Sequence, residues 1–530
     1  MSMRSTFYNL FTVRCSFVAA VILFTATVGH AQAPGIQWQK SYGGSGLDGA
    51  NNVRQTNDGG FIYGAYSNSN DSEVTGNHGD VDCWVVKTDS AGNIQWERSL
   101  GGSGYDQVDQ IKIDVNGGYI VAAFTTSDDG DVTGNHGGGD GWLIKLDDTG
   151  GIVWQKVMGS SGYDFFNTVC NTPDSGYIIV GAAGADGGDI SGYLGGGGDV
   201  WVIKCTKTGA ISWNKVYGGT AYEIGFDVVP TADNGCYGLG VRQGAGSIAG
   251  YIGGVEDAWL LRLDDTGGLS WAKTYGGSED DKADALIETA AGNYIVAGYS
   301  NSNDGNVSNN HGGYDFWAVA VDDTGKVLWD NCYGGSGYES AFAAVATFDG
   351  GAILGGVSTT TSGEITGTHG EGDFWSVKIN DTGGLVWENS FGGSLGDTIY
   401  GIIQTADSGY LLTGTTHSKD GDVTTTYGGG DMWSVKLAKD IPTAIIPVNP
   451  IADIKVYPTL TRGLVHIDMQ QGYEKAVVKL TDILGRSCLD IPMTTGLNRT
   501  VSLNGLPAGV FLLQVINNGR VNTYKINYHP

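Results

Sequence analysis

Short apolar runs alternate with polar turns rich in Gly and Asp along residues 35–440, and this pattern repeats every 58 or 59 residues. Two tryptophans mark each repeat, and together they account for all 14 tryptophans of the chain. A fixed period of this length is typical of repeat architectures, in which each repeat is one supersecondary unit stacked on its neighbours. The first series is Trp38, Trp96, Trp154, Trp213, Trp271, Trp329 and Trp387, and the second is Trp84, Trp142, Trp201, Trp259, Trp317, Trp375 and Trp433.

Each repeat contains four β-rich runs, separated by two tight turns and one long polar loop. Asn-Gly, Asp-Gly and Gly-Gly dipeptides in the tight turns indicate β-hairpins. Each repeat is therefore expected to fold as a four-stranded antiparallel meander. In the second repeat the four runs cover residues 105–111, 119–124, 140–145 and 152–156.

Seven such meanders around one axis predict an all-β fold, a seven-bladed β-propeller over residues 35–440. A parallel β-helix is the alternative, but its coils are much shorter than this period and lack tight hairpins. The ends of the repeat region support ring closure. It begins with a fourth-strand sequence at 36–40 and ends with a third-strand sequence at 433–436, so the two can complete a single blade and leave it no exposed edge.

The hairpin between the third and fourth strands supports the same fold. Residues 320–329, with the sequence AVDDTGKVLW, resemble the tryptophan-docking motif of quinoprotein propellers, although they are one residue shorter. The resemblance implies that Trp329 and its equivalents pack between neighbouring blades. The same turn also resembles the Asp-box of sialidases, which is a structural element. Nothing else in the chain suggests a quinone cofactor, and neither resemblance argues for an enzyme.

Residues 1–31 are predicted to be a secretory signal peptide. Arg4 and Arg14 precede or border an apolar run over 15–28, and small residues follow, with cleavage expected after Ala31 or Ala33. The apolar run is shorter than the roughly 20 residues that a membrane-spanning helix needs. No later segment is apolar enough to cross a bilayer, so the mature chain is expected to have no transmembrane segment.

Charge and cysteine usage narrow the range of partners. The formal net charge is −28, which makes nucleic acid a poor partner, because affinity for phosphate rests on Lys and Arg. Divalent cations suit such a surface better, although the acidic residues could also simply keep an exported protein soluble. Six cysteines follow the signal peptide at irregular spacings, which predicts buried apolar side chains instead of a disulfide framework.

The repeats stop before a proline-rich linker at 441–452, and residues 453–530 read as short strands of a small β-sandwich. This segment resembles the type A C-terminal sorting domain of the type IX secretion system of Bacteroidetes. One departure is that Thr459 and Leu460 follow the proline where the family has Asn-Pro. The matching motif residues are Tyr457, Pro458, Asp482, Gly485, Arg486, Leu506, Pro507, Gly509 and Lys525.

The resemblance to the sorting domain implies a route and several partners. It implies export through the periplasm by the type IX secretion machinery, and removal of the tail by its sortase within the linker. The mature protein is then either secreted or attached to surface lipopolysaccharide at the outer membrane.

Two rings of acidic residues are predicted on one face of the propeller, because the loops after the second and fourth strands of a meander lie on the same side. One ring follows the strand-four loop: Asp48, Asp106, Asp164, Glu223, Asp281, Glu339 and Asp397. The other ends the strand-two loop: Asp82, Asp140, Asp199, Asp257, Asp315, Asp373 and Asp431.

Two interpretations of the second ring stay open. Calcium binds six to eight oxygens on flexible, Gly-rich loops, so each blade could hold one ion. Alternatively, each Asp accepts backbone N–H bonds in a turn before the third strand. Presence in all seven repeats favours the turn, and the chain has no EF-hand spacing.

Candidate ligand contacts are the tyrosines of the strand-four loops, which could stack on sugar rings or wedge between blades. The four residues 244–247 lack the acids found in other repeats, so this sector is expected to differ. The tyrosines are Tyr105, Tyr163, Tyr222 and Tyr338.

No catalytic motif singles out an enzyme. The chain has no GxSxG, HExxH or phosphate-binding loop, and its many carboxylates distinguish no acid–base pair. The leading prediction is a non-catalytic propeller that binds a glycan or protein ligand at the cell surface. A purely structural cell-envelope repeat protein and a secreted polysaccharide hydrolase or lyase are the alternatives.

Overall fold

The computed structural model describes residues 31–243, 252–440 and 454–528, the last range with short gaps at 459, 462, 470–476, 483–486, 493–497, 508 and 518–519. In these residues every regular element is a β-strand. None of them forms a helix that is long and apolar enough to cross a membrane. The predicted signal peptide over 1–31, apart from its last residue, and the predicted linker at 441–452 lie outside the described residues.

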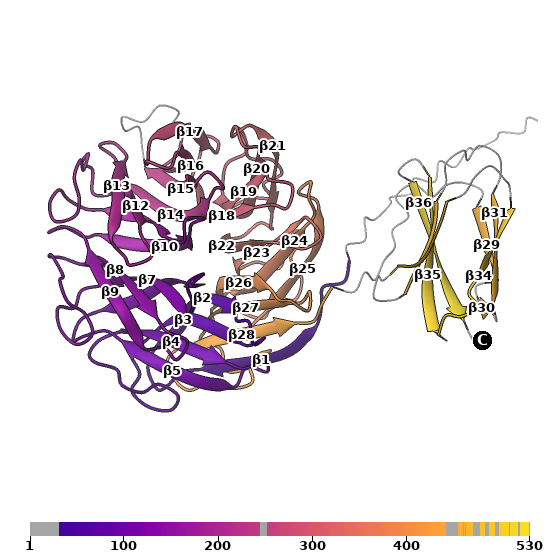
Figure 1. The fold of residues 1–530 in the computed structure, drawn as a ribbon, viewed down its shortest axis with the longest axis horizontal. Coiled ribbons are helices and arrows are strands. Elements are labelled where there is room, and N and C mark those ends of the chain that lie inside the picture. The colour runs from indigo at the N-terminus through magenta and orange to yellow at the C-terminus, as the bar shows by residue number, and fades with distance from the viewer. Residues whose placement is uncertain are drawn as a thin grey trace, which may run out of the picture.

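Seven four-stranded antiparallel sheets surround a central axis, as the seven-bladed propeller requires (Figure 1). The fold prediction is confirmed. The first four blades are β2–β5 (Asp48–Gln55, Phe61–Ser67, Asp82–Thr88, Ile94–Leu100), β6–β9 (Asp106–Ile113, Tyr119–Thr125, Asp140–Leu146, Ile152–Met158), β10–β13 (Phe165–Asn171, Tyr177–Ala183, Asp199–Cys205, Ile211–Tyr217) and β14–β17 (Glu223–Pro230, Cys236–Gln243, Glu256–Leu263, Leu269–Tyr275).

The ring closes through a blade built from both ends of the repeat region. Its sheet order is β1-β28-β27-β26, and β1 pairs antiparallel with β28 (Figure 1). The predicted closure is therefore confirmed. The last three blades are β18–β21 (Asp281–Glu288, Tyr294–Ser300, Asp315–Val321, Val327–Tyr333), β22–β25 (Glu339–Ala346, Ala352–Ser358, Asp373–Ile379, Leu385–Phe391) and β26–β28 (Asp397–Gln404, Tyr410–Thr416, Asp431–Leu437) with β1 (Ile36–Tyr42).

The two tryptophan series have different packing roles. The third-strand tryptophans, such as Trp84 and Trp142, are completely buried between sheets. The fourth-strand tryptophans lie against the next blade. Trp96 lies 6.1 Å from the Tyr119 ring of the following blade, and the indole N–H of Trp329 donates to the carbonyl of Asp381 at 3.1 Å. The fourth-strand series thus joins neighbouring blades, as the docking motif implies.

Every innermost strand carries a β-bulge at the same position, and these seven strands surround the axis. In β2 the pairing shifts between Ala50 and Asn52, so Asn51 is the extra residue, and in β6 the extra residue is Asp109. A bulge bends the strand and redirects a side chain, which is why bulges are frequent next to functional sites. The full set is Asn51, Asp109, Asn167, Phe226, Asp284, Phe342 and Tyr400.

The C-terminal segment forms two sheets, one ordered β29-β31-β34 and the other β30-β36-β35-β32-β33. Their facing side chains form one apolar core that includes Val465, Leu480 and Leu513. The predicted small β-sandwich is therefore present. The strands are β29 (Ile454–Tyr457), β30 (Leu460–Thr461), β31 (Leu464–Met469), β32 (Val477–Asp482), β33 (Ser487–Pro492), β34 (Asn498–Ser502), β35 (Gly509–Asn517) and β36 (Arg520–Tyr528).

The sorting-motif residues fall at strand ends and on the surface. Tyr457 ends β29 with 47% of its surface exposed, and Pro458 follows it. Leu506 and Pro507 precede the start of β35 at Gly509. Asp482 ends β32, Lys525 is exposed on β36, and Gly485 and Arg486 lie outside the described residues.

Candidate functional site

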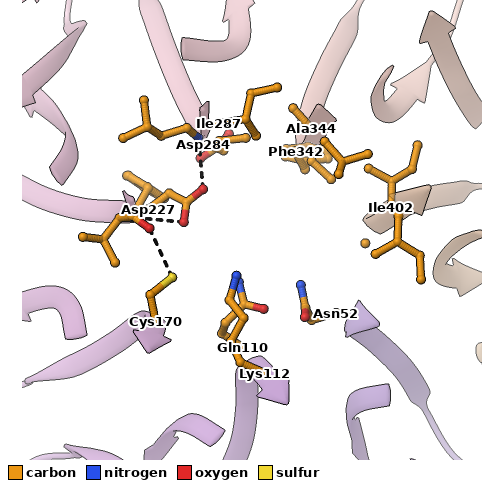
Figure 2. Close-up of a pocket in the computed structure, with 18 of the residues that line it drawn as sticks. Asn52, Gln110, Lys112, Cys170, Asp227, Asp284, Ile287, Phe342, Ala344 and Ile402 are labelled. Carbon is orange, nitrogen blue, oxygen red and sulfur yellow. Dashed lines mark hydrogen bonds between the residues drawn. The ribbon is translucent and has the colours of Figure 1, made fainter. Parts of the chain in front are cut away.

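A cavity of about 730 Å³ occupies the centre of the propeller and is lined by the innermost strand of every blade (Figure 2). This volume lies within the range of small-molecule pockets, which is roughly 300–1,000 Å³. All seven bulge residues line its wall: Asn51, Asp109, Asn167, Phe226, Asp284, Phe342 and Tyr400. We refer to this cavity as the central channel.

The lining differs from one side of the channel to the other. Phe342, Ala344 and Ile402 form an apolar side, whereas Gln110, Lys112 and Asp227 come from blades with polar linings (Figure 2). On the apolar side the Phe342 and Tyr400 rings lie 5.4 Å apart, and Tyr400 is 37% exposed. The channel therefore presents aromatic surface opposite hydrogen-bonding groups.

Two asparagines on the polar side also connect neighbouring blades. The side-chain amide of Asn51 donates to the carbonyl of Val108 at 2.8 Å, and that of Asn167 donates to the carbonyl of Gly225 at 2.8 Å. Each bond joins one innermost strand to the next. These two residues thus help to hold the wall while they line it.

The channel carboxyl groups have perturbed proton affinities. Burial raises the pKa of Asp109 to about 8, against the opposing effect of a hydrogen bond from Gln107. Burial also raises the pKa of Asp284 to about 6, although the ammonium of Lys282, 3.2 Å away, favours its charged form. At pH 7 Asp109 is therefore mostly protonated and Asp284 mostly ionised. Such separated proton affinities within one cavity are typical of functional sites.

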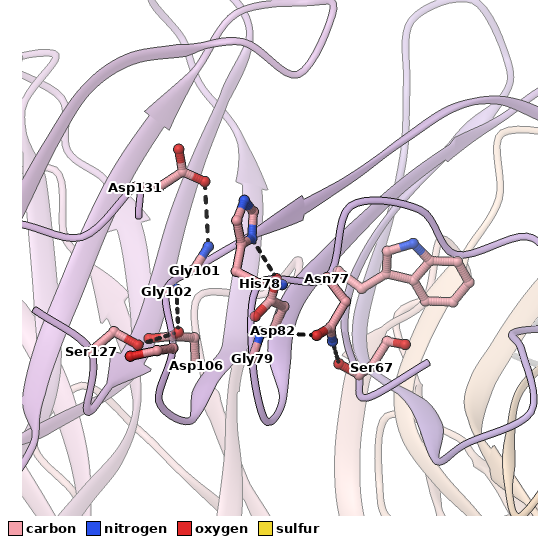
Figure 3. A network of polar contacts seen from close by, with 12 residues as sticks. Ser67, Asn77, His78, Gly79, Asp82, Gly101, Gly102, Asp106, Ser127 and Asp131 are labelled. Carbon is pink, nitrogen blue, oxygen red and sulfur yellow. Dashed lines mark hydrogen bonds and ion pairs between the residues drawn. The ribbon is translucent and has the colours of Figure 1, made fainter. Parts of the chain in front are cut away.

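The two predicted acidic rings do lie side by side, but both are buried instead of forming an exposed rim. Between the first two blades, Oδ2 of Asp82 accepts the backbone N–H of His78 at 2.9 Å and contacts its imidazole Nδ1 at 2.7 Å (Figure 3). Oδ2 of Asp106 accepts the N–H of Gly102 at 2.8 Å and the Ser127 hydroxyl at 2.7 Å. Each carboxylate holds one loop in place.

The same geometry recurs around the ring. Each aspartate of the second ring accepts a backbone N–H from four or five residues earlier, which is the turn that the sequence offered as the alternative to calcium. The donors are His78, His136, Leu194, Ile252, His311, His369 and Tyr427.

The acids of the two rings converge in pairs at the blade junctions. A Cβ placed on Gly101 would lie 2.6 Å from Oδ2 of Asp106 and 2.9 Å from Oδ1 of Asp82, so both carboxyl groups close on this glycine. Burial raises the pKa of Asp82, and the charge of Asp106 raises it further. We call these seven arrangements the junction pairs.

Each junction pair also contains a buried oxygen with few contacts. Within the described residues, Oδ1 of Asp82, Asp140 and Asp373 has no hydrogen-bond partner. No group of three or more His, Cys, Asp and Glu side chains that could hold a metal occurs in the part of the chain that the structure describes. A single proton would satisfy such an oxygen, whereas calcium takes six to eight oxygen ligands, and calcium binding stays a prediction.

The tyrosines expected on the ligand face lie near the blade junctions and do not line the central channel. Tyr163 is 64% exposed and stacks on Phe124 at 6.0 Å, and Tyr338 contacts Tyr314 at 5.4 Å. Tyr105 and Tyr222 are half-buried. The divergent loop at 244–247 lies outside the described residues.

The channel residues were missed by the sequence analysis. A bulge changes which side chains of a strand face the axis, and alternation alone does not reveal it. One signal was present, however. The residue three positions after each first-ring acid differs between repeats, whereas the first-ring position itself is always Asp or Glu. In chain order the seven differing residues are Asn, Asp, Asn, Phe, Asp, Phe and Tyr.

Comparison with known proteins identifies the C-terminal segment. Residues 455–527 match a family described as "Secretion system C-terminal sorting domain". The chain thus carries a type IX sorting tail that marks it for export to the cell surface or the medium and for interaction with the secretion machinery. None of the curated proteins matches the chain.

Among solved structures, the similarities are remote. A puromycin hydrolase is 14% identical with a TM-score of 0.38, and the match covers 71% of this chain and 51% of that one, so the chain spans about half its length. Drosophila Semaphorin 2a is 6% identical with a TM-score of 0.40, covering 94% and 99%. A thermostable family-43 glycoside hydrolase is 11% identical with a TM-score of 0.27, covering 56% and 93%. Scores this low say nothing about function.

Proposed function

We propose that this protein is an exported, non-catalytic binding protein whose central channel takes a carbohydrate. One observation carries the proposal: the seven bulge positions share one backbone geometry and all line the channel, yet they bear Asn, Asp, Asn, Phe, Asp, Phe and Tyr. A scaffold alone needs no such variation, whereas a ligand without sevenfold symmetry does.

The chemistry of the lining suits a sugar. Sugar rings have apolar faces that pack on aromatic side chains, here Phe342 and Tyr400, and a rim of hydroxyl groups. Amide and carboxyl groups such as those of Gln110 and Asp109 can donate to and accept from those hydroxyls. A cavity with a large apolar surface and a few placed polar groups is the usual form of a small-molecule site.

A glycan array probed with the mature chain tests the proposal. We expect binding to a limited set of glycans, and we expect Tyr400→Ala to weaken it at least about tenfold because the stacking surface is lost. Tyr163→Ala is the matched control, since Tyr163 is exposed on the rim and outside the channel. An array without signal would contradict the proposal and favour the structural role in the cell envelope. Equal losses of glycan binding in Tyr400→Ala and Tyr163→Ala would instead indicate a site that includes the tyrosines of the strand-four loops.

A secreted polysaccharide hydrolase is the second candidate, and the pKa values of Asp109 and Asp284 favour it. Glycoside hydrolases use one protonated and one ionised carboxyl group, which is the state of these two residues near neutral pH. Release of reducing ends from a bound glycan, abolished in both Asp109→Asn and Asp284→Asn, would support this candidate. Binding without release would support the binding protein.

The fate of the tail follows from the family of its match. We infer that the sortase of the type IX system removes the tail within the linker at 441–452, and that the mature chain is then released or attached to surface lipopolysaccharide. Mass spectrometry of the mature C-terminus distinguishes these fates, because attachment adds mass that release does not.

A further inference from the structure

The polar side of the central channel contains two adjacent cationic side chains, Arg54 on β2 and Lys112 on β6. They occupy equivalent strand positions, six residues after Asp48 and Asp106. The other five blades have no charge at this position. Their residues are Cys170, Val229, Ile287, Val345 and Ile403. We call Arg54 and Lys112 the cation pair.

Elsewhere, the propeller gives its buried lysines an anionic partner. Five lysines of the third strands each lie within 2.7–3.1 Å of a carboxylate oxygen and are at most 9% exposed. These five lysines are Lys87, Lys145, Lys204, Lys378 and Lys436. Among the described residues neither member of the cation pair has such an ion pair. The lack of an ion pair therefore distinguishes the cation pair of the channel from the five third-strand lysines.

The nearby groups do not neutralise the cation pair. Arg54 donates to the Gln110 side-chain oxygen at 3.1 Å and to the carbonyl of Val53 at 2.6 Å, both of which are neutral. Asp227 attracts Lys112 electrostatically, but its own oxygens accept from the backbone N–H groups of Val228 at 2.8 Å and Leu286 at 3.0 Å. The Asp227 carboxylate is thus held against the wall.

Burial makes this arrangement unfavourable for the protein alone. It lowers the pKa of Arg54 and of Lys112, and the charge of Arg54 lowers that of Lys112 further. Two like charges without close anionic partners cost stability when they leave water. In a chain of net charge −28, with acids available, such a pair points to an anion supplied from outside.

The carboxylates of the channel leave the cation pair without a direct partner. Asp227 attracts both cations but is held by backbone N–H groups, Asp284 lies 3.2 Å from Lys282, and Glu288 is exposed at the end of β18. Among the described residues none of these three carboxylates forms an ion pair with Arg54 or Lys112. We propose that the cation pair binds the carboxylate of an acidic sugar of the uronic-acid class, with the sugar ring directed to Phe342 and Tyr400 across the channel. This inference rests on the proposed function, because it names the substrate class of the same site.

The chemistry of the two cations fits this assignment. The planar guanidinium of Arg matches a carboxylate with two parallel hydrogen bonds, and the ammonium of Lys adds a point charge with three donors. A neutral sugar would leave both cations without an anion. Discrimination against neutral sugars is therefore expected from the energy of leaving a half-buried charge unpaired.

The test is a calorimetric titration of the mature chain with glucuronic acid, glucose and glucose 6-sulfate at constant ionic strength. We expect glucuronic acid to bind at least about tenfold more tightly than glucose, and we expect Arg54→Gln and Lys112→Gln each to abolish this preference. Lys40→Gln is the control, because Lys40 binds Asn93 outside the channel. Both channel variants should fold, since each removes one of two like charges on half-buried side chains, and a melting temperature at or above wild type checks this.

The outcomes separate this inference from the proposed function. Equal binding of glucose and glucuronic acid, or a preference that survives both channel variants, would overturn the carboxylate assignment and leave the carbohydrate proposal intact. Equally tight binding of the sulfate ester would also overturn it, because any monoanion would then suffice. If no sugar binds, the proposed function fails. Titration with acetate then decides the inference: binding that is lost in Arg54→Gln supports the carboxylate site, and no binding overturns it.

Discussion

Asp109 illustrates how burial in the channel determines the charge of a single side chain. Its pKa of about 8 in the folded protein is above the ordinary value of 3.8, so the folded state binds the proton more tightly than the unfolded chain. The resulting stabilisation is complete below about pH 4 and is lost as the pH rises through about 8. Asp109→Asn is neutral at every pH and has no such loss.

We therefore expect the melting temperature of Asp109→Asn to match wild type near pH 5 and to exceed it by a few degrees at pH 9. Thermal denaturation followed by circular dichroism measures both. Asp147→Asn is the control, because Asp147 is exposed in a turn and its equivalent in the sixth repeat is already Asn380. A difference between Asp109→Asn and wild type that is the same at both pH values would contradict the assignment.

At the residue scale the sequence predicted positions better than environments. It placed Asp82 and its six equivalents where the strand-two loop meets the third strand, which is where the structure has them, but it could not show that they are buried against a second acid. Burial depends on how neighbouring blades meet, and that contact joins residues about one repeat apart. The channel residues depend in addition on a bulge, whose position in β6 is visible only in the strand pairing.

At the scale of elements, the junction pairs are expected to make blade packing depend on pH. Burial raises the pKa of Glu339 from 4.5 to about 7, and the charge of Asp315 raises it further, while His311 opposes the change. The stabilisation from the bound proton is thus complete below about pH 4.5 and lost as the pH rises through about 7. We expect Glu339→Gln to be more stable than wild type at pH 8 and similar at pH 4.5, by thermal denaturation. The exposed Glu371→Gln should show no such difference.

Metal removal distinguishes a shared proton from calcium at these junctions. A shared proton would remove one of the two negative charges of a pair without an ion, so we expect EDTA to leave the melting temperature unchanged at neutral pH. A fall in EDTA that excess calcium reverses would contradict the shared proton and support the calcium prediction. Magnesium in place of calcium is the control for a nonspecific effect of divalent ions.

The fourth-strand tryptophans are expected to carry much of the adhesion between blades. Trp387 is 1% exposed, donates to Asp440 at 2.9 Å and meets the Tyr410 ring at 5.7 Å. We expect Trp387→Ala to lower the free energy of unfolding by about 3–5 kcal/mol, measured by chemical denaturation. Val153→Ala, at a 58% exposed position of a fourth strand, should change it by no more than about 0.5 kcal/mol. Equal effects would show that the interblade contact contributes little.

At the scale of the whole molecule, the sorting tail and the propeller are expected to have separable tasks. We expect deletion of residues 455–530 to keep the protein inside the cell while the melting temperature of the propeller stays unchanged. Surface labelling and analysis of the medium measure the location. Fusion of residues 441–530 to an unrelated periplasmic protein is the complementary control and should cause its export. Surface exposure of the truncated chain would contradict the role of the tail.

The whole fold was predictable because one period governs it. The tryptophan register gives the number of blades, the Gly-rich turns give the strands within each blade, and the incomplete repeats at both ends give the closure. The ligand was not predictable in this way, since function on a propeller depends on side chains that differ between blades, and the fold itself does not specify them.

The closing blade has a consequence for the order of events during synthesis. Ile36, among the first residues of the propeller to be made, pairs with Leu437 at its far end. The earliest strand must therefore wait for the latest one, and the ring of seven blades cannot close before residue 437 has been made. Until then β1 has an open edge that any extended segment could occupy, including one from another copy. A cell that makes this protein has to keep that edge unoccupied until translation has passed residue 437.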